Sequence, residues 1–239
     1  MREMPPITKN LLIINAIAFF AMYVLNMRGI DLNDLLGLHF FIASDFRPYQ
    51  FVTYMFMHAN WQHIFFNMFA LWMFGMTVER VMGQKRFLIF YLVCGIGAGL
   101  IQEVVQYVEY YAEGLAAYDV VNDGITQIGM DVYLNSWTTV GASGAIYGIL
   151  LAFGMLFPEN RIFIFPLPVP IKAKWFVVIY AAIELFSGFA SYGTSNVAHF
   201  AHLGGMLFGF LLLRHWQKGG GSNTHFFGGS KQYNRFFRE

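Results

Sequence analysis

The chain has 239 residues, of which 57% are hydrophobic and only 12% are charged. This charged fraction is about half that of an ordinary soluble domain, whose exterior needs charge to stay in water. A bilayer, in contrast, accepts helices that are apolar all round. The composition therefore argues against a soluble enzyme and predicts a multi-pass membrane protein.

The balance of charge and the single cysteine exclude further classes. Fifteen basic residues against fourteen acidic ones leave a net charge of +1, which gives no basis for expecting a nucleic-acid partner. Cys94 is the only cysteine and lies in an apolar run. An intramolecular disulfide and a cysteine-based zinc site are therefore both excluded.

Apolar windows along the chain predict an all-α polytopic bundle of six transmembrane helices. Crossing about 30 Å of hydrocarbon takes about 20 helical residues, and open strands would leave backbone groups unpaired in lipid. Six windows approach or exceed that length, at residues 11–27, about 51–78, 87 to about 102, about 143–157, 175 to about 192, and 197–213.

Basic residues set the expected orientation. The first window follows two prolines and two basic residues, and no small-residue cleavage site comes after it, so we expect a retained span rather than a removed signal peptide. With six spans, thirteen of the fifteen basic residues fall on the side of the two termini, and only Arg28 and Arg47 fall opposite. The positive-inside rule then places both termini in the cytoplasm and the acidic segment 103–131 outside.

Several segments are not simple spans. Residues 28–50 form an outer loop with many apolar side chains, which we expect to lie in the membrane interface. The 103–136 insertion keeps helical spacing beyond the third window and then signals a turn at 122–124. We expect residues 1–216 to form one membrane domain and the glycine-rich residues 217–239 a flexible cytoplasmic tail.

The fourth window opens with Gly141-Ala142-Ser143-Gly144, followed by Tyr147. At a helix start, several backbone N–H groups have no helical acceptor, and the helix dipole favours negative charge there. These are conditions for a nucleophile beside an oxyanion site. The alternative is that the small residues only allow helices to pack closely.

The sixth window carries His202, followed by Gly205 and Gly209. A histidine inside a membrane span is costly unless it faces the bundle interior, so it is a functional candidate. Gly205 and Gly209 are four residues apart, as are Gly144 and Gly148. These glycine faces predict close contact between the fourth and sixth spans.

The second window adds His63 and Asn67, one helical turn apart on one face. His63, Ser143 and His202 each lie 14 residues before the expected inner end of their span. At 1.5 Å per residue, all three lie about 21 Å above that boundary, or roughly 9 Å below the outer surface. We therefore expect one polar layer recessed in the membrane.

In their order and spacing, the polar segments at 58–67, 141–147 and 201–205 resemble the signature of the rhomboid intramembrane serine proteases. The resemblance covers most of residues 10–216 and includes the second-span exit at 75–80. One departure lies in the first outer loop, where the family often has a Trp-Arg pair and this chain has Pro48-Tyr49-Gln50. The acidic insertion is also not part of the family minimum. The segments that carry the resemblance are Gly-Ala-Ser-Gly with a Tyr at 141–147, Ala-His-Leu-Gly-Gly at 201–205 with a later Gly, and His-Ala-Asn-Trp-Gln-His-Ile-Phe-Phe-Asn at 58–67.

The resemblance implies that Ser143 is the nucleophile and His202 the general base, acting as a dyad without a carboxylate. His63, Asn67 and the Ser143 backbone N–H would then donate hydrogen bonds to the oxyanion. No acidic residue lies in the matching layer of the second, fourth and sixth spans. A triad would therefore need an acidic loop residue such as Asp131.

Other polar residues receive supporting or competing assignments. Tyr147 is a candidate surface for orienting the imidazole, with ordinary aromatic packing as the alternative. His199 competes with His202 as the base, and His58 is expected to be a structural hydrogen-bonding residue near the outer surface. Glu184, in the fifth window, needs a partner in lipid, either to tune a mobile helix or as a static hydrogen bond within the bundle. The supporting small residues are Gly141, Gly144, Gly205 and Gly209.

The predicted function is a serine endopeptidase that cleaves transmembrane segments of other proteins near the outer side of the membrane. Substrate helices are expected to carry helix-destabilising residues, because a regular helix protects its own peptide bonds. We expect membrane lipid as a partner, a bacterial inner membrane as the location, and no cofactor, metal or nucleic acid. The alternatives are a catalytically silent rhomboid-like protein that binds clients, and a metal-binding or transport bundle that uses His58, His63, His199 and His202.

Overall fold

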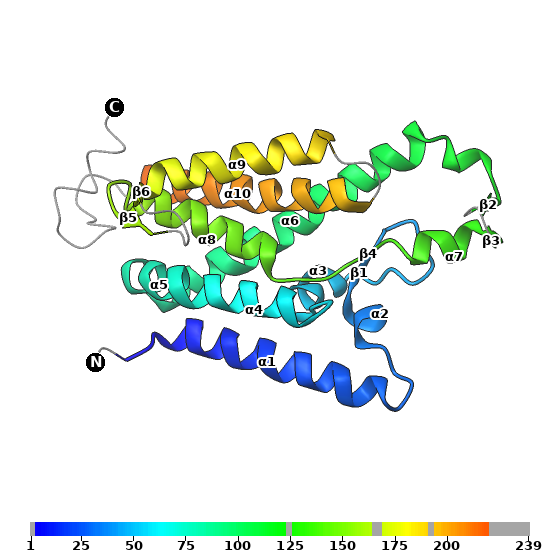
Figure 1. Ribbon diagram of the computed structural model, residues 1–239, viewed down its shortest axis with the longest axis horizontal. Coiled ribbons are helices and arrows are strands. Elements are labelled where there is room, and N and C mark those ends of the chain that lie inside the picture. Colours follow the sequence, from blue (N-terminus) through cyan, green and yellow to red (C-terminus); the bar gives the residue numbers. More distant parts are fainter. Residues whose placement is uncertain (1–2, 123–125, 164–168, 191–193, 220–239) are drawn as a thin grey trace.

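The computed structural model describes residues 3–122, 126–163, 169–190 and 194–219, with side chains from 198 to 218 in the last range. Most of this part of the chain is helical (Figure 1). The longer helices are α1 (Pro6–Asn26), α4 (Trp61–Ala70), α5 (Met76–Met82), α6 (Gln84–Ala112), α8 (Ser143–Leu156), α9 (Ala173–Ala190) and α10 (Thr194–Gly219). A π-helical stretch, Leu71–Gly75, joins α4 to α5.

The remaining elements are short and lie in the connections. They are α2 (Leu32–Leu36), β1 (Leu38–His39), α3 (Gln50–Thr53), β2 (Val120–Asn122), β3 (Gln127–Gly129), α7 (Met130–Asn135), β4 (Thr138–Thr139), β5 (Arg161–Ile162), β6 (Ile171–Lys172), and 3₁₀ turns at Tyr54–Phe56 and Leu115–Ala117. The strands pair antiparallel as β1 with β4, β2 with β3, and β5 with β6.

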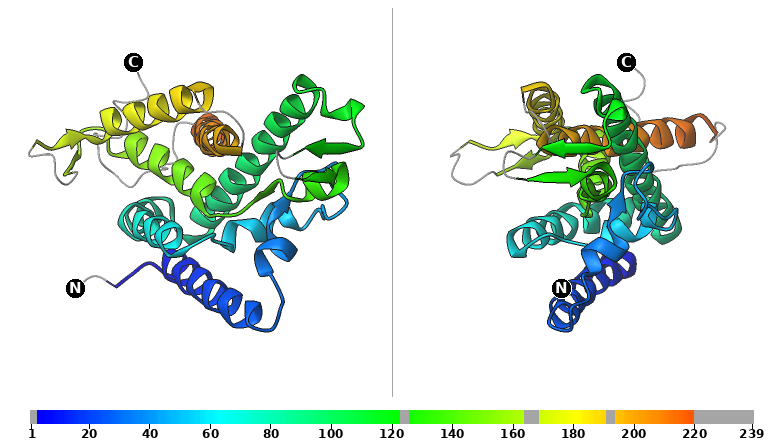
Figure 2. Two further views of the ribbon diagram at one scale, coloured as in Figure 1. Left: turned by 45° about the vertical axis from the view of Figure 1, so that its right-hand side comes forward. Right: turned by 90° about the vertical axis from the view of Figure 1, so that its right-hand side faces the viewer.

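Helix α10 lies among α6, α8 and α9, and one view in Figure 2 looks nearly along its axis. Helix α8 also contacts α6 and α9, so α8 and α10 each have helices on several sides, while α9 lies at the edge of this group. Helices α4 and α5 flank this group, and α1 packs beside α4 at the edge (Figure 1). The elements that carry Ser143 and His202 are therefore both interior.

The surface of the bundle is that of a membrane protein. Among the described residues, four helices are long and apolar enough to cross a bilayer, namely α1, the continuous helix 61–82, α6 and α9, and α8 is a shorter apolar helix. Large apolar side chains point outward, including Ile17 at 63% and Phe186 at 72% exposure. An exposed apolar surface of this extent suits lipid rather than water. A polytopic helical bundle is thus confirmed, while the number of six spans stays a prediction.

The second predicted span begins too early. Residues 51–60 form the end of α3, a 3₁₀ turn and a loop, and the helix begins only at Trp61, where the side chain of Asn60 accepts the backbone N–H of His63 at 2.8 Å. The apolar residues before it belong to the protein core. Tyr54 is buried, and its hydroxyl donates to the Gly95 carbonyl at 2.7 Å.

Helix α6 is longer than the third predicted window, which spans 87 to about 102. It continues to Ala112, because the helical spacing of apolar residues persists beyond residue 102. Between α5 and α6 the chain reverses at Gly83, whose φ of +78° favours glycine.

Helix α1 is fastened to the bundle by a buried carboxylate. Glu79 of α5 accepts hydrogen bonds from the backbone N–H groups of Ile7 and Thr8 at 3.0 and 2.7 Å, and from the Thr8 hydroxyl at 2.7 Å. A negative charge is favourable at a helix N-terminus, where N–H groups have no helical acceptor.

The first outer loop is held by the insertion. Strand β1 pairs with β4, and Phe40 and Ala43 of the loop cluster with Leu134 and Trp137 of the insertion. The ring nitrogens of the buried His39 contact the carbonyl oxygens of Asp34 at 2.6 Å and Asn135 at 3.0 Å. The insertion thus packs against the outer loop.

Further contacts stabilise the same loop, one with helix α6 and others within the loop itself. Glu103 of α6 accepts the backbone N–H of Phe41 at 2.8 Å. Gln50, which stands in the stretch that departs from the family pattern, is buried, accepts the Arg47 backbone N–H at 2.9 Å and donates to the Asp45 carbonyl at 3.1 Å. The loop is therefore anchored by its own glutamine and by its neighbours.

Two sequence expectations lie partly outside the described residues. The turn predicted at 122–124 falls mostly on residues 123–125, which lie outside the described part of the chain, while the flanking strands β2 and β3 are paired. The predicted tail begins within helix, because α10 continues to Gly219, and residues 220–239 are not described.

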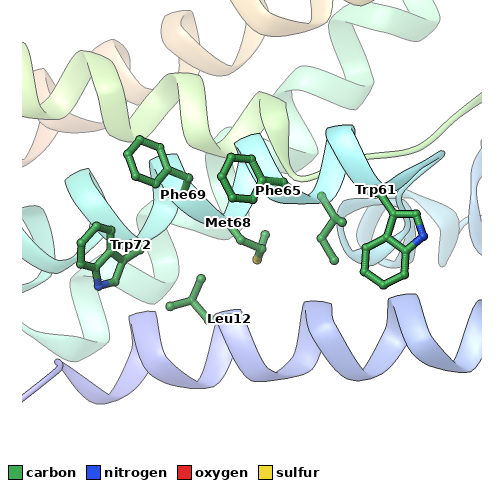
Figure 3. A pocket seen from close by; sticks show the side chains of 7 residues that line it. Leu12, Trp61, Phe65, Met68, Phe69 and Trp72 are labelled. Atoms are coloured by element: carbon green, nitrogen blue, oxygen red, sulfur yellow. The ribbon is translucent and has the colours of Figure 1, made fainter. Parts of the chain in front are cut away.

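An apolar groove of about 440 Å³ lies between α1 and α4 (Figure 3). Leu12 of α1 faces a row of side chains from the opposite helix, and the lining consists of Leu12, Trp61, Ile64, Phe65, Met68, Phe69 and Trp72. No titratable side chain lines this groove. The chemistry-bearing residues gather elsewhere, at the start of α8.

Candidate active site

Ser143 and His202 form a hydrogen-bonded pair. Ser143 is the first residue of α8, His202 lies on α10, and His202 Nε2 is 2.9 Å from Ser143 Oγ. Ser143 is half-buried, and 19% of the His202 side chain is exposed. The pair is therefore recessed but not sealed.

Glycines bring the two helices this close. A Cβ atom at Gly205 would lie 1.9 Å from the Gly144 carbonyl oxygen, and one at Gly148 would lie 3.1 Å from the Gly205 carbonyl oxygen. A Cβ at Gly209 would lie 3.4 Å from the Gly148 Cα. The two glycine faces meet as their spacing predicts, and larger residues would separate Ser143 from His202.

His63 lies beside Ser143, across Gly141. Gly141 has a φ of +134°, and a Cβ there would lie 2.8 Å from His63 Nε2 and 3.7 Å from Ser143 Oγ. The backbone N–H of Ala59 points at His63 Nδ1 over 3.4 Å. This contact makes Nδ1 the acceptor, so the proton of a neutral ring is carried by Nε2, on the side of Gly141.

Asn67 lies one turn beyond His63 on α4 and is buried. Its side-chain Nδ2 has no hydrogen-bond partner among the described residues. A buried donor without an acceptor is costly unless a ligand supplies one.

Tyr147 lies one turn after Ser143 and stacks on the imidazole of His202. The ring centroids are 4.2 Å apart, and the planes differ by 9°. The tyrosine ring thus limits the tilt of the imidazole. The tyrosine hydroxyl donates to Glu184 Oε1.

Glu184 brings a carboxylate to this site, which corrects the expectation that only an acidic loop residue could do so. It lies on α9, is buried, and its Oε2 is 3.1 Å from His202 Nδ1 and 2.6 Å from His199 Nδ1. Asp131 is instead exposed on α7. Glu184 lies on the fifth predicted span, whereas the residue counts that predict the polar layer use only the second, fourth and sixth spans. The signal that points to Glu184 is the need of an ionisable residue in a span for a partner.

The two other candidate histidines occupy different positions. The ring of His199 is 6.5 Å from that of His202 and contacts the shared Glu184 carboxylate. His58, in the segment before α4, is buried with its ring edge-on to His63 at 5.1 Å. Burial, with a smaller effect of His63, lowers the pKa of His58 to about 4. A backbone hydrogen bond with Phe56 partly offsets this lowering of the pKa, and the structural role expected of His58 stays a prediction.

Only part of the proposed histidine-rich metal site comes together. In the described chain, Glu184, His199 and His202 have potential ligand atoms within 4.8 Å of one another, whereas His58 and His63 are not members of this group. The two histidine Nδ1 atoms both lie at hydrogen-bond distance from the same carboxylate oxygen. Hydrogen bonding therefore accounts for this geometry without a metal.

Comparison with known protein families assigns most of the chain to one of them. Residues 45–216, well over half of the chain, match the family model of the Rhomboid domain. The chain belongs to the rhomboid family. The matched range includes the whole of the proposed site, from His63 to His202, and excludes all of α1 and the tail from residue 217.

Relatives of this rhomboid protein come from bacteria and from organelles. It is 29% identical over 209 residues to Rhomboid-like protein 11, chloroplastic, of Arabidopsis thaliana, covering 85% of this chain and 62% of that protein. It is 30% identical to Rhomboid protease AarA of Providencia stuartii, covering 66% and 52%, and 28% identical to Rhomboid protease GluP of Bacillus subtilis, covering 68% and 25%. The matched part thus spans from a quarter to about three fifths of these relatives.

The glycine contact predicts unequal effects of two alanine substitutions in α10 of this rhomboid protein. Gly205→Ala should lower the free energy of unfolding by about 1 to 3 kcal/mol, because the new methyl group meets backbone that cannot move aside. Gly209→Ala should cost less, because its nearest neighbours are the ends of the Phe90 and Cys94 side chains at 3.0 and 3.1 Å. Thermal unfolding in detergent measures both variants, and an equal loss would contradict the assigned contact.

Proposed function

We propose that this rhomboid protein is an intramembrane serine endopeptidase with Ser143 as nucleophile and His202 as general base. The observation that carries the proposal is the 2.9 Å contact between Ser143 Oγ and His202 Nε2 inside an otherwise apolar bundle. A serine hydroxyl is a weak nucleophile until a base accepts its proton, and this contact provides the base. The names of two relatives, Rhomboid protease AarA and Rhomboid protease GluP, favour the same activity.

In the proposed reaction, these two side chains and water carry out the bond-making and proton-transfer steps. Ser143 Oγ attacks the carbonyl carbon of the scissile peptide bond while its proton passes to His202 Nε2. The same nitrogen returns the proton to the leaving amine, and an acyl-enzyme remains. Water then attacks the ester carbonyl and loses a proton to His202 Nε2, the ester C–O bond breaks as that proton passes to Ser143 Oγ, and the acid product leaves as a carboxylate after losing its own proton to solvent. No metal or cofactor takes part.

Three donors are proposed for the developing oxyanion, namely His63 Nε2, Asn67 Nδ2 and the Ser143 backbone N–H. The position of His63 across Gly141 and the unpartnered amide of Asn67, among the described residues, support the two side-chain roles. The Ser143 N–H lies at a helix start, where the dipole also favours negative charge. Such donors accelerate the reaction because they act where charge develops in the transition state.

The proposed substrates are transmembrane segments of other proteins. We place the reactive layer within a six-span bundle about 9 Å below the outer surface, which follows from residue counts in the sequence. Substrate helices should contain glycine, proline or small polar residues near the cleavage site, because these expose a peptide bond at lower cost. Membrane lipid is proposed to surround the bundle and the substrate helix. Water can reach Ser143 and His202 because both side chains are partly exposed.

The two rival functions make different predictions for purified protein. A client-binding protein without catalysis gives no reason for a hydrogen-bonded serine and histidine at a glycine-mediated contact. A metal-binding bundle should retain a stoichiometric transition metal after purification. Metal analysis together with a cleavage assay therefore separates all three functions.

The proposed dyad predicts non-additive losses of activity. Ser143→Ala, His202→Ala and the double variant should be about equally inactive, because residues that act as one unit do not contribute separately. Cleavage is measured in proteoliposomes with a panel of single-span peptides that differ in glycine and proline content. An inactive Ser143→Ala variant with a fully active His202→Ala variant would remove His202 from the role of base.

The proposed oxyanion site predicts that Asn67→Ala slows catalysis without abolishing it, unlike the substitutions of Ser143 and His202. Loss of one donor should lower kcat by about 10²- to 10³-fold, while KM changes little, because the lost contact forms in the transition state. Thermal unfolding is measured beside the kinetics to separate this effect from a loss of folding. A correctly folded Asn67→Ala variant with the wild-type rate would exclude Asn67 from the oxyanion site.

The thirteen-to-two distribution of basic residues predicts cytoplasmic termini and an outward-facing insertion. Cysteines are introduced separately at Asp119 and Ser222 in a Cys94→Ala background and treated with an impermeant thiol reagent. In intact cells, the cysteine at 119 should be labelled, and the one at 222 should be labelled only after permeabilisation. Labelling of the tail position alone would contradict the proposed orientation.

A further inference from the structure

We infer that Glu184 is a positioning residue for His202, so that the proposed dyad works as a Ser143–His202–Glu184 triad. This inference rests on the proposed function and departs from the carboxylate-free arrangement that the family resemblance implies. Three helices supply the three members: α8 supplies the serine, α10 the histidine and α9 the glutamate. The two contacts lie on opposite ring nitrogens of one imidazole.

Counting donors and acceptors fixes the tautomer of His202. A carboxylate only accepts hydrogen bonds, so the 3.1 Å contact between Glu184 Oε2 and His202 Nδ1 requires the proton to be on Nδ1. Nε2 of a neutral ring then carries the lone pair, and this nitrogen faces Ser143 Oγ at 2.9 Å. That tautomer is the one that can accept the serine proton. Without an acceptor at Nδ1, the other tautomer would compete and would place an N–H against the serine oxygen.

The carboxylate also stabilises the charge that forms on the histidine. When Nε2 receives the serine proton, the ring becomes an imidazolium within a largely apolar bundle. Glu184 is 6% exposed, and no lysine or arginine in the described part of the chain forms an ion pair with it. A negative charge at 3.1 Å, poorly screened by water, therefore lowers the cost of the charged intermediate.

The carboxylate is itself held from two other directions. The hydroxyl of Tyr147 donates to Oε1, and the ring of the same tyrosine stacks on His202. His199 Nδ1 contacts Oε2 at 2.6 Å. The groups that face His202 are thus Ser143, Glu184 and Tyr147, and His63 lies beside Ser143 across Gly141. His199 helps to hold Glu184, which gives it a role other than that of an alternative base.

Glu184→Gln tests the inference because it preserves the size of the side chain and removes its charge. We expect kcat to fall by about 10⁴-fold, the loss found when the acidic member of a serine-protease triad is removed, while KM changes by less than about threefold. The rate at which a fluorophosphonate probe labels Ser143 should fall in parallel. Glu184→Asp keeps the charge and should recover part of the lost rate.

Glu103→Gln is the matched control. Glu103 is also a buried glutamate on a long apolar helix, but it accepts a hydrogen bond from Phe41 in the outer loop, away from Ser143. The control should keep the wild-type kcat and labelling rate even where its unfolding temperature falls. A similar loss of kcat in both variants would indicate a general effect of removing a buried carboxylate and would overturn the inference.

A spectroscopic readout tests the same arrangement without any variant of Glu184. In spectra of the wild-type protein with ¹⁵N-labelled histidine, the His202 signals are identified by their loss in His202→Ala. They should report a proton on Nδ1, and a ring protonated on Nε2 alone would overturn the inference even where Glu184→Gln fails to fold.

The outcomes separate this inference from the proposed function. A wild-type protein that is neither labelled at Ser143 nor able to cleave any peptide would overturn both. A wild-type protein that labels and cleaves, with Glu184→Gln within threefold of its kcat, would leave the protease function standing and overturn the triad alone.

Discussion

A polar side chain inside an apolar bundle must find its hydrogen-bond partners within the protein, and the site around His202 follows from that constraint. Both ring nitrogens of His202 are engaged, Nε2 by Ser143 and Nδ1 by Glu184. The carboxylate is in turn satisfied by Tyr147 and His199. Because each of these hydrogen bonds joins side chains on two different helices, the cluster holds α8, α9 and α10 in one relative arrangement.

Such a cluster requires helices that approach closely and do not shift. Glycines at the contact of α8 with α10 allow the approach, since a Cβ at Gly205 would collide with the backbone at Gly144. The periphery stabilises the arrangement through other buried carboxylates. Glu79 caps the start of α1, and Glu103 holds the first outer loop beside the insertion. Outside the site, acidic side chains thus stabilise the fold by accepting hydrogen bonds from backbone N–H groups.

Sequence patterns predict the helices and the two glycine faces, because apolar length and residue spacing are local properties. They also place Ser143 and His202 in one layer by residue counting. The early boundary at residue 51 arose because core residues such as Tyr54 are as apolar as residues that face lipid. The partner of Glu184 could not be predicted, since it depends on how α9 is rotated against α10. The packing of the insertion against the outer loop likewise depends on long-range contacts.

The central claim is that Ser143 is a nucleophile whose oxyanion lies between His63 and Asn67. An experimental structure of the protein after reaction with a fluorophosphonate tests it most directly, because the phosphonyl group copies the tetrahedral intermediate. The account predicts a phosphorus bonded to Ser143 Oγ, with its free oxygen directed at His63 Nε2, Asn67 Nδ2 and the Ser143 N–H. An adduct on another residue, or a phosphonyl oxygen directed away from α4, would contradict it.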